Sequence, residues 1–194
     1  MKIILASKSG VRKKILDKYK INNEVIVSNV DEDEIKESLL AEGANPKIIS
    51  KNLAEIKSIR VSNKHPDRLV LGADSVVCLN DELINKPKSR EEAFLILKKL
   101  NNSVHNLISS VCISKNGSMI WNYTDVSELK MKKLTDESLN KYLNKIKTDT
   151  LLAYGVYQIE ADGLELFEYV KGDKDSIMGL PVKKIINYIK QYLK

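Results

Sequence analysis

Cysteine is scarce in this chain of 194 residues, and its two cysteines, Cys78 and Cys112, have no metal-binding spacing. Both lie in short apolar runs, so we expect buried free thiols rather than a disulfide or a zinc site. No apolar run approaches the roughly 18 residues of a membrane span. The N-terminal MKIILAS has a four-residue apolar run, too short for a signal-peptide core. We therefore expect a cytoplasmic protein with no membrane partner.

Several catalytic signatures are also missing. The sequence has neither a Walker A loop nor a GxGxxG fingerprint, which disfavours P-loop enzymes and dinucleotide-binding folds. It has no GxSxG, no Cys–His signature and no acidic Nudix helix, so a covalent hydrolase or a Nudix enzyme is unsupported. The two histidines, His65 and His105, do not form a metal pair by spacing. We expect His65 in a surface turn and His105 in a structural position.

Charge is plentiful and mixed. The composition is 43% hydrophobic and 30% charged with a net charge of +6, which is typical of a soluble globular protein. The basic residues are dispersed among 26 acidic ones, and the densest basic run, Lys130 to Lys133, has no aromatic ladder beside it. A lysine-rich solvated surface with no nucleic-acid partner is favoured over an RNA-binding domain. A modest excess of cations also suits a polyphosphate ligand.

Short apolar runs alternate with amphipathic segments, which indicates an α/β fold. We expect a single domain over residues 1–194, with two lobes around a cleft. Strands are predicted at 3–6, 24–28, 69–79 (interrupted at 72–74), 104–114, 119–130, 156–159 and 164–170. Helices are predicted after the turn at 7–10, from Pro46 with Asn45 as its cap, from Ser89, at 134–146 and at 182–193. Hairpin turns are expected at 116–117 and 162–163.

Two places stand out as carriers of chemistry. The turn Ser7 to Gly10 lies between a strand and a helix N-terminus, where backbone N–H groups, serine hydroxyls and Arg12 suit an anion. The alternative is an ordinary capped helix with a surface arginine. Asp74 interrupts an apolar strand, where an unpaired carboxylate is costly and indicates a metal, a cation or a catalytic task. The alternative is a turn residue.

Other polar residues give weaker signals. Asp31 and Glu32 could supply a second carboxylate, although the run from 31 to 34 also has the composition of a solvated acidic loop. Lys57 lies in the predicted polar half of its helix, and Lys86 lies in a tight loop before Pro87. Taken alone, both lysines are expected to be solvated.

Together these segments resemble the Maf family of nucleotide pyrophosphatases, also called septum-formation-inhibitor proteins. They occur in family order and cover nearly the whole chain. The matching stretches are LASKSGVRKKIL, VDE at 30–32, LAEIK at 53–57, LGADSVV at 71–77, NKPKS at 85–89 and GDKDSIMGLPV at 172–182.

The resemblance implies an elongated mixed β-sheet flanked by helices, similar to the inosine-triphosphate pyrophosphatases, and often a homodimer. It implies hydrolysis of a nucleoside triphosphate to the monophosphate and pyrophosphate with a divalent cation, usually Mg²⁺, with Mn²⁺ as the alternative. By carry-over, Asp74 is the catalytic aspartate and Glu32 its partner in metal binding. The predicted phosphate-binding residues are Ser7, Ser9, Arg12, Lys57 and Lys86. Asp74 is left as either a metal ligand or the general base.

The residues that set base specificity in the family are altered here. They correspond to Val11, Ser75 and Glu160: Ser75 resembles the branch that acts on dTTP and UTP, Glu160 the branch that acts on 7-methyl-GTP, and Val11 neither. The family's usual Lys/Cys-Ala-Gly is also replaced here, by Leu152-Ala153-Tyr154-Gly155. The base therefore stays open among dTTP or UTP, 7-methyl-GTP and other modified nucleotides. The alternative function is a nucleotide-binding regulator of cell division with little catalysis.

Overall fold

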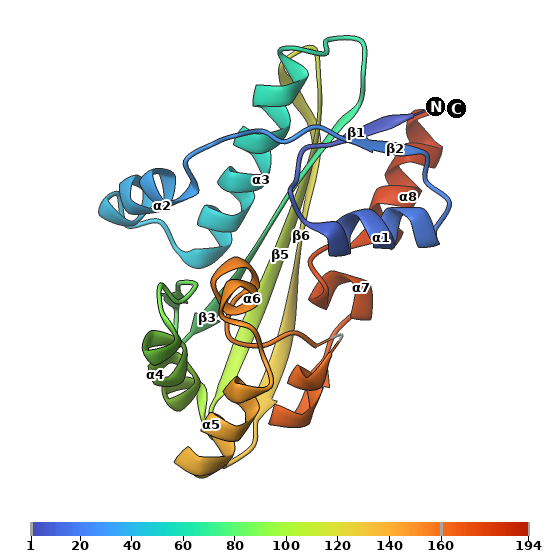
Figure 1. Cartoon of the computed structure of the whole chain (residues 1–194). Coiled ribbons are helices and arrows are strands. Elements are labelled where there is room, and N and C mark those ends of the chain that lie inside the picture. The colour runs from blue at the N-terminus through green and yellow to red at the C-terminus, as the bar shows by residue number, and fades with distance from the viewer. Residues whose placement is uncertain (1, 160, 194) are drawn as a thin grey trace. The chain divides into compact units, whose positions relative to one another are not determined.

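The computed structural model describes residues 2–159 and 161–193 (Figure 1). Its strands form one mixed sheet in the order β2-β1-β3-β5-β6-β7, with β4 paired to β3, and helices flank the sheet. The expected α/β class is confirmed. The strands are β1 (Ile3–Leu5), β2 (Asn23–Val25), β3 (Val70–Leu79), β4 (Glu82–Ile84), β5 (Val104–Lys115), β6 (Ser118–Met131) and β7 (Phe167–Lys171). The helices are α1 (Gly10–Lys18), α2 (Glu32–Ala41), α3 (Pro46–Ser62), α4 (Arg90–Leu100), α5 (Asp136–Asn144), α6 (Thr148–Tyr154), α7 (Lys174–Ile177) and α8 (Val182–Tyr192), with a 3₁₀ turn at Asp162–Leu166.

The chain divides into two compact units. Unit 1 comprises residues 1–75, 108–126 and 173–194, and unit 2 comprises residues 76–107 and 127–172. Each unit has its own hydrophobic core, so the core of unit 1 and that of unit 2 are described separately.

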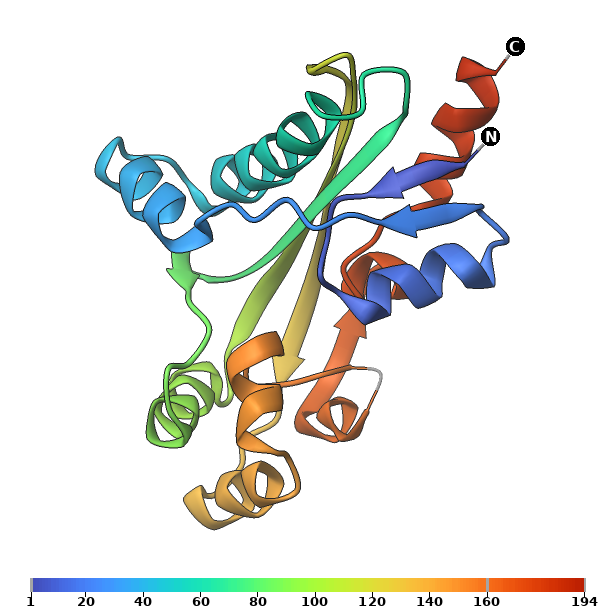
Figure 2. The same cartoon turned by 45° about the horizontal axis from the view of Figure 1, so that its top comes forward.

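Unit 1 is built around the parallel strands β2, β1 and β3. Side chains alternate along β1: Ile3 and Leu5 join a core that includes residues of α1 and α8, whereas Ile4 packs with Val61 of α3. A strand covered on both faces must be apolar on both, which explains its continuous apolar run. In Figures 1 and 2, α3 and α1 accordingly lie on opposite sides of the first half of β3.

Local signals define the boundaries of these elements. Asn45 caps α3, with its side chain accepting from the Ile48 backbone N–H at 2.9 Å, as predicted. The predicted turn between β5 and β6 is also confirmed, since Asn116 and Gly117 have φ values of 51° and 73°. Both residues adopt the left-handed conformation that a tight hairpin requires.

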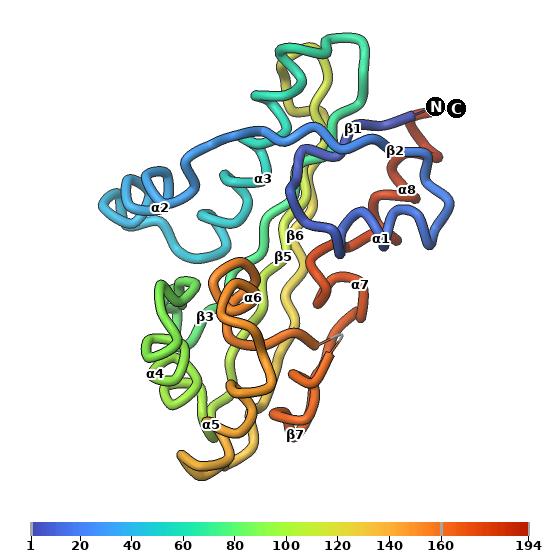
Figure 3. The backbone as a smooth tube through the Cα atoms, in the orientation of Figure 1, coloured from blue at the N-terminus to red at the C-terminus, as the bar shows by residue number. Residues whose placement is uncertain are grey.

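Helices α4, α5 and α6 of unit 2 lie near one another along the backbone trace (Figure 3). Their buried apolar side chains belong to one core. Ser89 caps α4 and Thr135 caps α5, each accepting a hydrogen bond from a backbone N–H three residues on. Strand β4 pairs antiparallel with the end of β3, and β7 pairs antiparallel with the end of β6. The largest fully buried side chains of this core are Leu97, Leu100, Leu129, Met131 and Leu139.

Several sequence expectations need correction. Strand β3 runs without interruption through Gly72 and Asp74, because partners from elsewhere in unit 1 occupy the positions opposite them. The acidic run after Asp31 begins helix α2 instead of a loop, with Asp31 as its cap. The second predicted hairpin is wrong: the structure assigns no strand to residues 156–159, and residues 162–166 form a 3₁₀ turn leading into β7. Helices α6 and α7 were not predicted.

Both cysteines are free and buried, as expected. Within the part of the chain that the structure describes, we find no helix whose length and apolar character would let it cross a membrane.

Candidate functional site

The turn between β1 and α1 ends at a well-capped helix N-terminus. The Ser9 hydroxyl accepts from the Arg12 backbone N–H at 3.3 Å and caps α1. The Ser7 hydroxyl is buried and accepts from the Ser9 backbone N–H at 3.2 Å and from Arg12 Nη1 at 3.1 Å. Because these oxygens act as acceptors, each hydroxyl keeps its own proton to donate. This arrangement suits an anion at a helix N-terminus, and the phosphate-binding roles of Ser7 and Ser9 stay predictions.

Arg12 joins several segments of unit 1 through its guanidinium group. Besides its bond to Ser7, it donates to the carbonyl oxygens of Ala73 and Gly179, both at 3.0 Å, and to Ser75 Oγ at 3.1 Å. These contacts use four of the five guanidinium N–H groups. At most one N–H is left for a phosphate in this conformation. Arg12 therefore holds both neighbours of Asp74 in place, and phosphate binding by its side chain stays a prediction.

Alternation along β3 decides which way its polar side chains point. Val70 packs with α3, and two residues later a Cβ at Gly72 would lie 2.1 Å from the carbonyl oxygen of Ala54 in α3. Only glycine permits so close an approach of the helix backbone. Two residues further on, Asp74 therefore faces α3, while Ser75 points to the opposite face, where Arg12 reaches it.

Lys57 is the α3 residue that meets Asp74. Its side chain is only 6% exposed, and its Nζ donates to Asp74 Oδ1 at 2.8 Å. The expectation that Lys57 lies on a solvated face is wrong. The buried face of α3 carries small residues at helical spacing, Ser50, Ala54 and Ser58, and Lys57 belongs to it. Small side chains let the helix approach the strand, and the Lys57 ammonium meets Asp74 of that strand.

Glu32 completes the cluster from the first position of α2. Its Oε1 lies 2.8 Å from Lys57 Nζ, so one ammonium group bridges two carboxylates. Glu32 is 38% exposed, whereas the Asp74 side chain is 7% exposed. The cluster thus has one buried carboxylate and one at its open side. Glu32 and Asp74 thus share one cation, Lys57. The predicted role of the two carboxylates as metal ligands stays a prediction.

The carboxylates of this cluster are matched by an equal number of cations when Arg12 is included. Burial lowers the pKa of the Arg12 guanidinium below its ordinary value, while the carboxylates of Asp74 and Glu32 raise it in opposition. Two carboxylates therefore face two cations, Lys57 and Arg12. Buried charges persist only when they are compensated in this way.

One atom in the cluster is unsatisfied. Asp74 Oδ2 is buried and has no hydrogen-bond partner among the described residues. Leaving a buried carboxylate oxygen without a partner is costly, so this oxygen is suited to a ligand.

The donor set fits a hard divalent cation such as Mg²⁺. Mg²⁺ is usually held by one or two carboxylates together with substrate phosphates and waters, and Asp74 and Glu32 supply two carboxylates. Over residues 2–159 and 161–193 no group of three or more His, Cys, Asp or Glu side chains is arranged to hold a metal. A metal here would need ligands from its substrate as well.

The remaining predicted residues are distributed as follows. Ser75 Oγ contacts Arg12 and lies 3.0 Å from Ser109 Oγ. Val11 packs partly buried against the core of unit 1. Lys86 belongs to unit 2, where it is exposed in the loop after β4. Glu160 lies outside the described residues. The specificity roles of Val11, Ser75 and Glu160 and the phosphate-binding role of Lys86 stay predictions.

Three residues of the site were missed at the sequence level. Ser109 supports Ser75, Gly179 accepts from Arg12 with a left-handed φ of 95°, and the Ser50 hydroxyl donates to the Asp74 carbonyl oxygen at 3.3 Å. The spacing of Ser50, Ala54 and Ser58 was a usable signal for a close helix contact. Ser109 gave no such signal, because its partner is remote in sequence. Gly179 lies in the matching stretch 172–182, but nothing in that stretch indicated its contact with Arg12.

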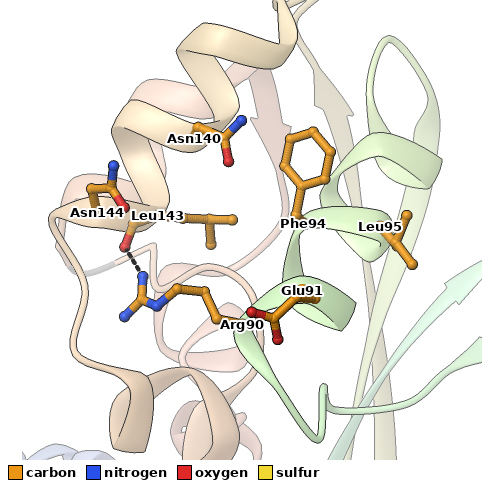
Figure 4. A pocket seen from close by; sticks show the side chains of 7 residues that line it. All are labelled: Arg90, Glu91, Phe94, Leu95, Asn140, Leu143 and Asn144. Atoms are coloured by element: carbon orange, nitrogen blue, oxygen red, sulfur yellow. Dashed lines mark hydrogen bonds between the residues drawn. The ribbon is translucent and has the colours of Figure 1, made fainter.

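Unit 2 contains a pocket of about 360 Å³ between α4 and α5 (Figure 4). It is lined by Arg90, Glu91, Phe94, Leu95, Asn140, Leu143 and Asn144. The Arg90 guanidinium donates to the carbonyl oxygens of Leu143 at 2.6 Å and Ile146 at 2.7 Å, at the end of α5. Arginine in this position satisfies the last carbonyls of a helix. The cation of this pocket thus has a structural task, and no predicted site residue lines the pocket.

Comparison with known proteins finds relatives that align over nearly the whole chain. A protein of Pelagibacter ubique named nucleoside triphosphate pyrophosphatase is 59% identical over 188 residues, covering 97% of this chain and 96% of the relative. A 7-methyl-GTP pyrophosphatase of Brucella abortus is 32% identical over 186 residues, covering 96% of this chain and 94% of the relative. Among solved structures, a HAM1 protein from Coxiella burnetii is 13% identical with a TM-score of 0.44, covering 68% of this chain and 73% of that one. The family model described as Maf-like protein matches residues 2–192. This chain therefore belongs to the Maf-like protein family.

Proposed function

We propose that this protein hydrolyses a nucleoside triphosphate to the nucleoside monophosphate and pyrophosphate. Relatives that align over nearly the whole chain carry the names nucleoside triphosphate pyrophosphatase and 7-methyl-GTP pyrophosphatase. The observation that carries the proposal is the cluster in which Lys57 bridges Glu32 and the buried Asp74, whose Oδ2 has no partner among the described residues. A protein that only binds a nucleotide has little need for such a carboxylate.

The chemistry requires charge compensation. When water attacks the α-phosphorus, negative charge accumulates on the phosphate oxygens and on the departing pyrophosphate. Lys57 supplies a cation next to the reacting group in this proposal. The N-terminus of α1, with Ser7 and Ser9, provides hydrogen-bond donors. Preorganised donors of this kind stabilise the transition state because they need no rearrangement during the reaction.

Asp74 has two oxygens in different surroundings. Oδ1 accepts from Lys57, and Oδ2 is available either to a metal or to the attacking water. As a general base it would take the proton of that water, and as a ligand it would hold the metal. Both roles require the carboxylate, so both predict loss of turnover on substitution.

The proposed cofactor is Mg²⁺, held by Asp74 and Glu32, with Mn²⁺ as a substitute. When bound, the metal neutralises phosphate charge and orders the water. The proposed site of action is the cytoplasm, in accord with the two free buried cysteines.

Base preference is proposed to depend on Val11, Ser75 and Glu160. The Ser75 hydroxyl already contacts Arg12 and Ser109, so its orientation is fixed before a base arrives. A nucleotide with a modified base, a 7-methylguanine base, or thymine or uracil remains the candidate substrate.

The test is incubation of the purified protein with Mg²⁺ and a panel of nucleotides. The panel comprises dTTP, UTP, CTP, ATP, GTP, 7-methyl-GTP and pseudouridine triphosphate. Release of pyrophosphate from at least one nucleotide is the expected result, and the rates give the base preference. Release of orthophosphate would move the reaction to the γ-phosphorus. No product from any nucleotide would contradict the proposal and favour a regulatory role.

A further inference from the structure

Lys57 occupies the position between two carboxylates that a metal ion would otherwise take. Its Nζ lies 2.8 Å from Asp74 Oδ1 and 2.8 Å from Glu32 Oε1. An ammonium group and a divalent cation cannot share this position, because both need the same oxygens and repel each other at short range. Binding of a metal by both carboxylates therefore requires Lys57 to leave.

We propose that Lys57 is an exchangeable counter-ion, which a divalent cation displaces and which the triphosphate then receives. The inference rests on the proposed function, because it assigns the displaced ammonium to the phosphate chain of the substrate. Lys57 thereby makes metal binding and triphosphate binding depend on each other.

The surroundings of Lys57 explain why the two events are coupled. The Lys57 side chain is 6% exposed, and a buried ammonium that loses its carboxylates without a new partner is strongly unfavourable. Metal alone therefore meets a competitor and also leaves a buried cation unpaired. A triphosphate removes both obstacles, since it offers oxygens to the ammonium and to the metal together.

The backbone around the cluster allows this exchange without movement of β3, the strand that carries Asp74. Gly72 lets α3 lie directly on β3, and the Ser50 hydroxyl donates to the Asp74 carbonyl oxygen at 3.3 Å. The Asp74 backbone is thus fixed from α3. Lysine has a flexible four-carbon stem, so its ammonium can change partner while its Cα stays in place.

The first test is a titration with Mn²⁺ alone, followed by the electron paramagnetic resonance of free Mn²⁺. Lys57→Met removes the competitor and keeps the aliphatic volume, so it is expected to bind Mn²⁺ about tenfold more tightly than the wild type, or more. The matched control is Lys47→Met, which removes the same charge from an exposed position of the same helix. The control is expected to leave Mn²⁺ affinity unchanged. Equal or weaker Mn²⁺ binding by Lys57→Met would overturn the inference.

The second test uses inorganic tripolyphosphate saturated with Mg²⁺, which has the phosphate chain and no base. Lys57→Met is expected to bind this complex about tenfold more weakly than the wild type, because the displaced ammonium is missing. Opposite changes for free metal and for the complexed phosphate are the signature of exchange. A loss of affinity for both ligands would indicate a damaged site and overturn the inference.

Removing Lys57 leaves two carboxylates without their shared cation, which can destabilise the fold. A second pair of variants avoids this problem: Glu32→Gln and Glu32→Gln/Lys57→Met both keep Asp74, and the double variant loses one charge of each sign. The double variant is expected to bind Mn²⁺ more tightly than Glu32→Gln alone, and the reverse order would contradict exchange. Should the wild type release no pyrophosphate from any nucleotide, the proposed function fails, while the Mn²⁺ titrations still decide whether Lys57 competes with metal.

Discussion

The two units bury different kinds of polar side chain. Unit 1 buries charged groups, Lys57, Asp74 and Asp175, together with a series of serines. Unit 2, over its described residues, buries only His105 and Ser127 among its polar side chains other than tyrosine and cysteine. The two units thus differ in how their buried polar groups are stabilised. Unit 1 pairs charges, and unit 2 keeps its titratable group neutral.

His105 is a buried titratable group of unit 2 that stays neutral. It is 1% exposed, its Nε2 lies 2.9 Å from the Tyr157 hydroxyl, and its ring is 5.7 Å from that of Phe167. Burial lowers the pKa of His105 from 6.5 to about 4, so the imidazole is neutral near neutral pH. The histidine belongs to an aromatic core, in agreement with the structural position expected from the sequence.

Unit 1 contains an instructive internal contrast. Asp175 is as buried as Asp74, but its two oxygens accept from Lys18 at 3.0 Å and from the Tyr19 hydroxyl at 2.6 Å. Asp74 keeps one buried oxygen without a partner among the described residues. The unsatisfied carboxylate, rather than burial alone, therefore marks the candidate site.

The largest expected effect is on Asp74. Asp74→Asn keeps the shape of the side chain and removes its charge, so turnover is expected to fall by about two orders of magnitude or more. Pyrophosphate release measures this loss, and circular dichroism checks that the variant is folded. The control is Asp67→Asn, the same change at an exposed position of unit 1, with no loss expected. Turnover by Asp74→Asn close to that of the wild type would remove Asp74 from the site.

The next effect concerns the pH dependence of stability through His105. An unfolded histidine takes up a proton near pH 6.5, whereas folded His105 does so only near pH 4. The unfolded state therefore binds more protons between these values, and the free energy of unfolding falls as the pH is lowered from 6.5 to 4. This group contributes a loss of about 3 kcal/mol.

Urea denaturation of the wild type and of His105→Gln at pH 7 and pH 4 isolates that contribution. The variant lacks the imidazole, so its stability is expected to fall by about 3 kcal/mol less than that of the wild type over this range. Identical pH dependence in the two proteins would show that His105 titrates normally and that unit 2 does not exclude its charge.

Gly72→Ala tests the close contact between α3 and β3. The added Cβ would lie 2.1 Å from the Ala54 carbonyl oxygen, so α3 must shift and Lys57 must move relative to Asp74. We expect a loss of about 2 kcal/mol in the free energy of unfolding and about tenfold in kcat/KM. For stability, the matched control is Gly10→Ala, where an added Cβ meets nothing within 4 Å. An unfolding midpoint equal to that of the wild type would mean that the helix does not depend on this glycine.

The smallest expected effects on stability come from removing one helix cap in each unit. Ser9→Ala removes the cap of α1 and Thr135→Ala removes the cap of α5, and each change is expected to cost about 1 kcal/mol of stability. Only Ser9→Ala is expected to weaken substrate binding, because only Ser9 lies in the predicted phosphate turn. Thermal unfolding and KM measurements separate the two effects. A similar rise in KM for both variants would argue against a phosphate-binding role for Ser9.

Local structure was predictable where the signal is local. The cap at Asn45, the cap at Ser89 and the turn at 116–117 depend on neighbours a few residues away, and all three are confirmed. Residues 156–159 and 162–166 were misjudged, because a short apolar stretch followed by Asp-Gly also fits a 3₁₀ turn.

The site itself depends on contacts that periodicity does not encode. Gly72 and Asp74 were taken to interrupt β3, because on their own they are poor strand residues. In the structure α3 fills the space left by Gly72, and Lys57 neutralises Asp74. Lys57 was expected to be solvated because lysines usually are, and only its partner on β3 explains its burial. Asp74 was singled out from its apolar neighbours alone, whereas Lys57 was singled out only through the resemblance to the Maf family.

The central claim is that Glu32, Lys57 and Asp74 form one site for metal and triphosphate. The most direct measurement is an anomalous difference map from a crystal that contains Mn²⁺ and a triphosphate analogue with a non-hydrolysable α,β-bridge. We expect a manganese peak within direct coordination distance of both the Asp74 and Glu32 carboxylates, with the Lys57 ammonium on a phosphate oxygen. A manganese peak elsewhere, with Lys57 still bridging the two carboxylates beside a bound nucleotide, would contradict the account.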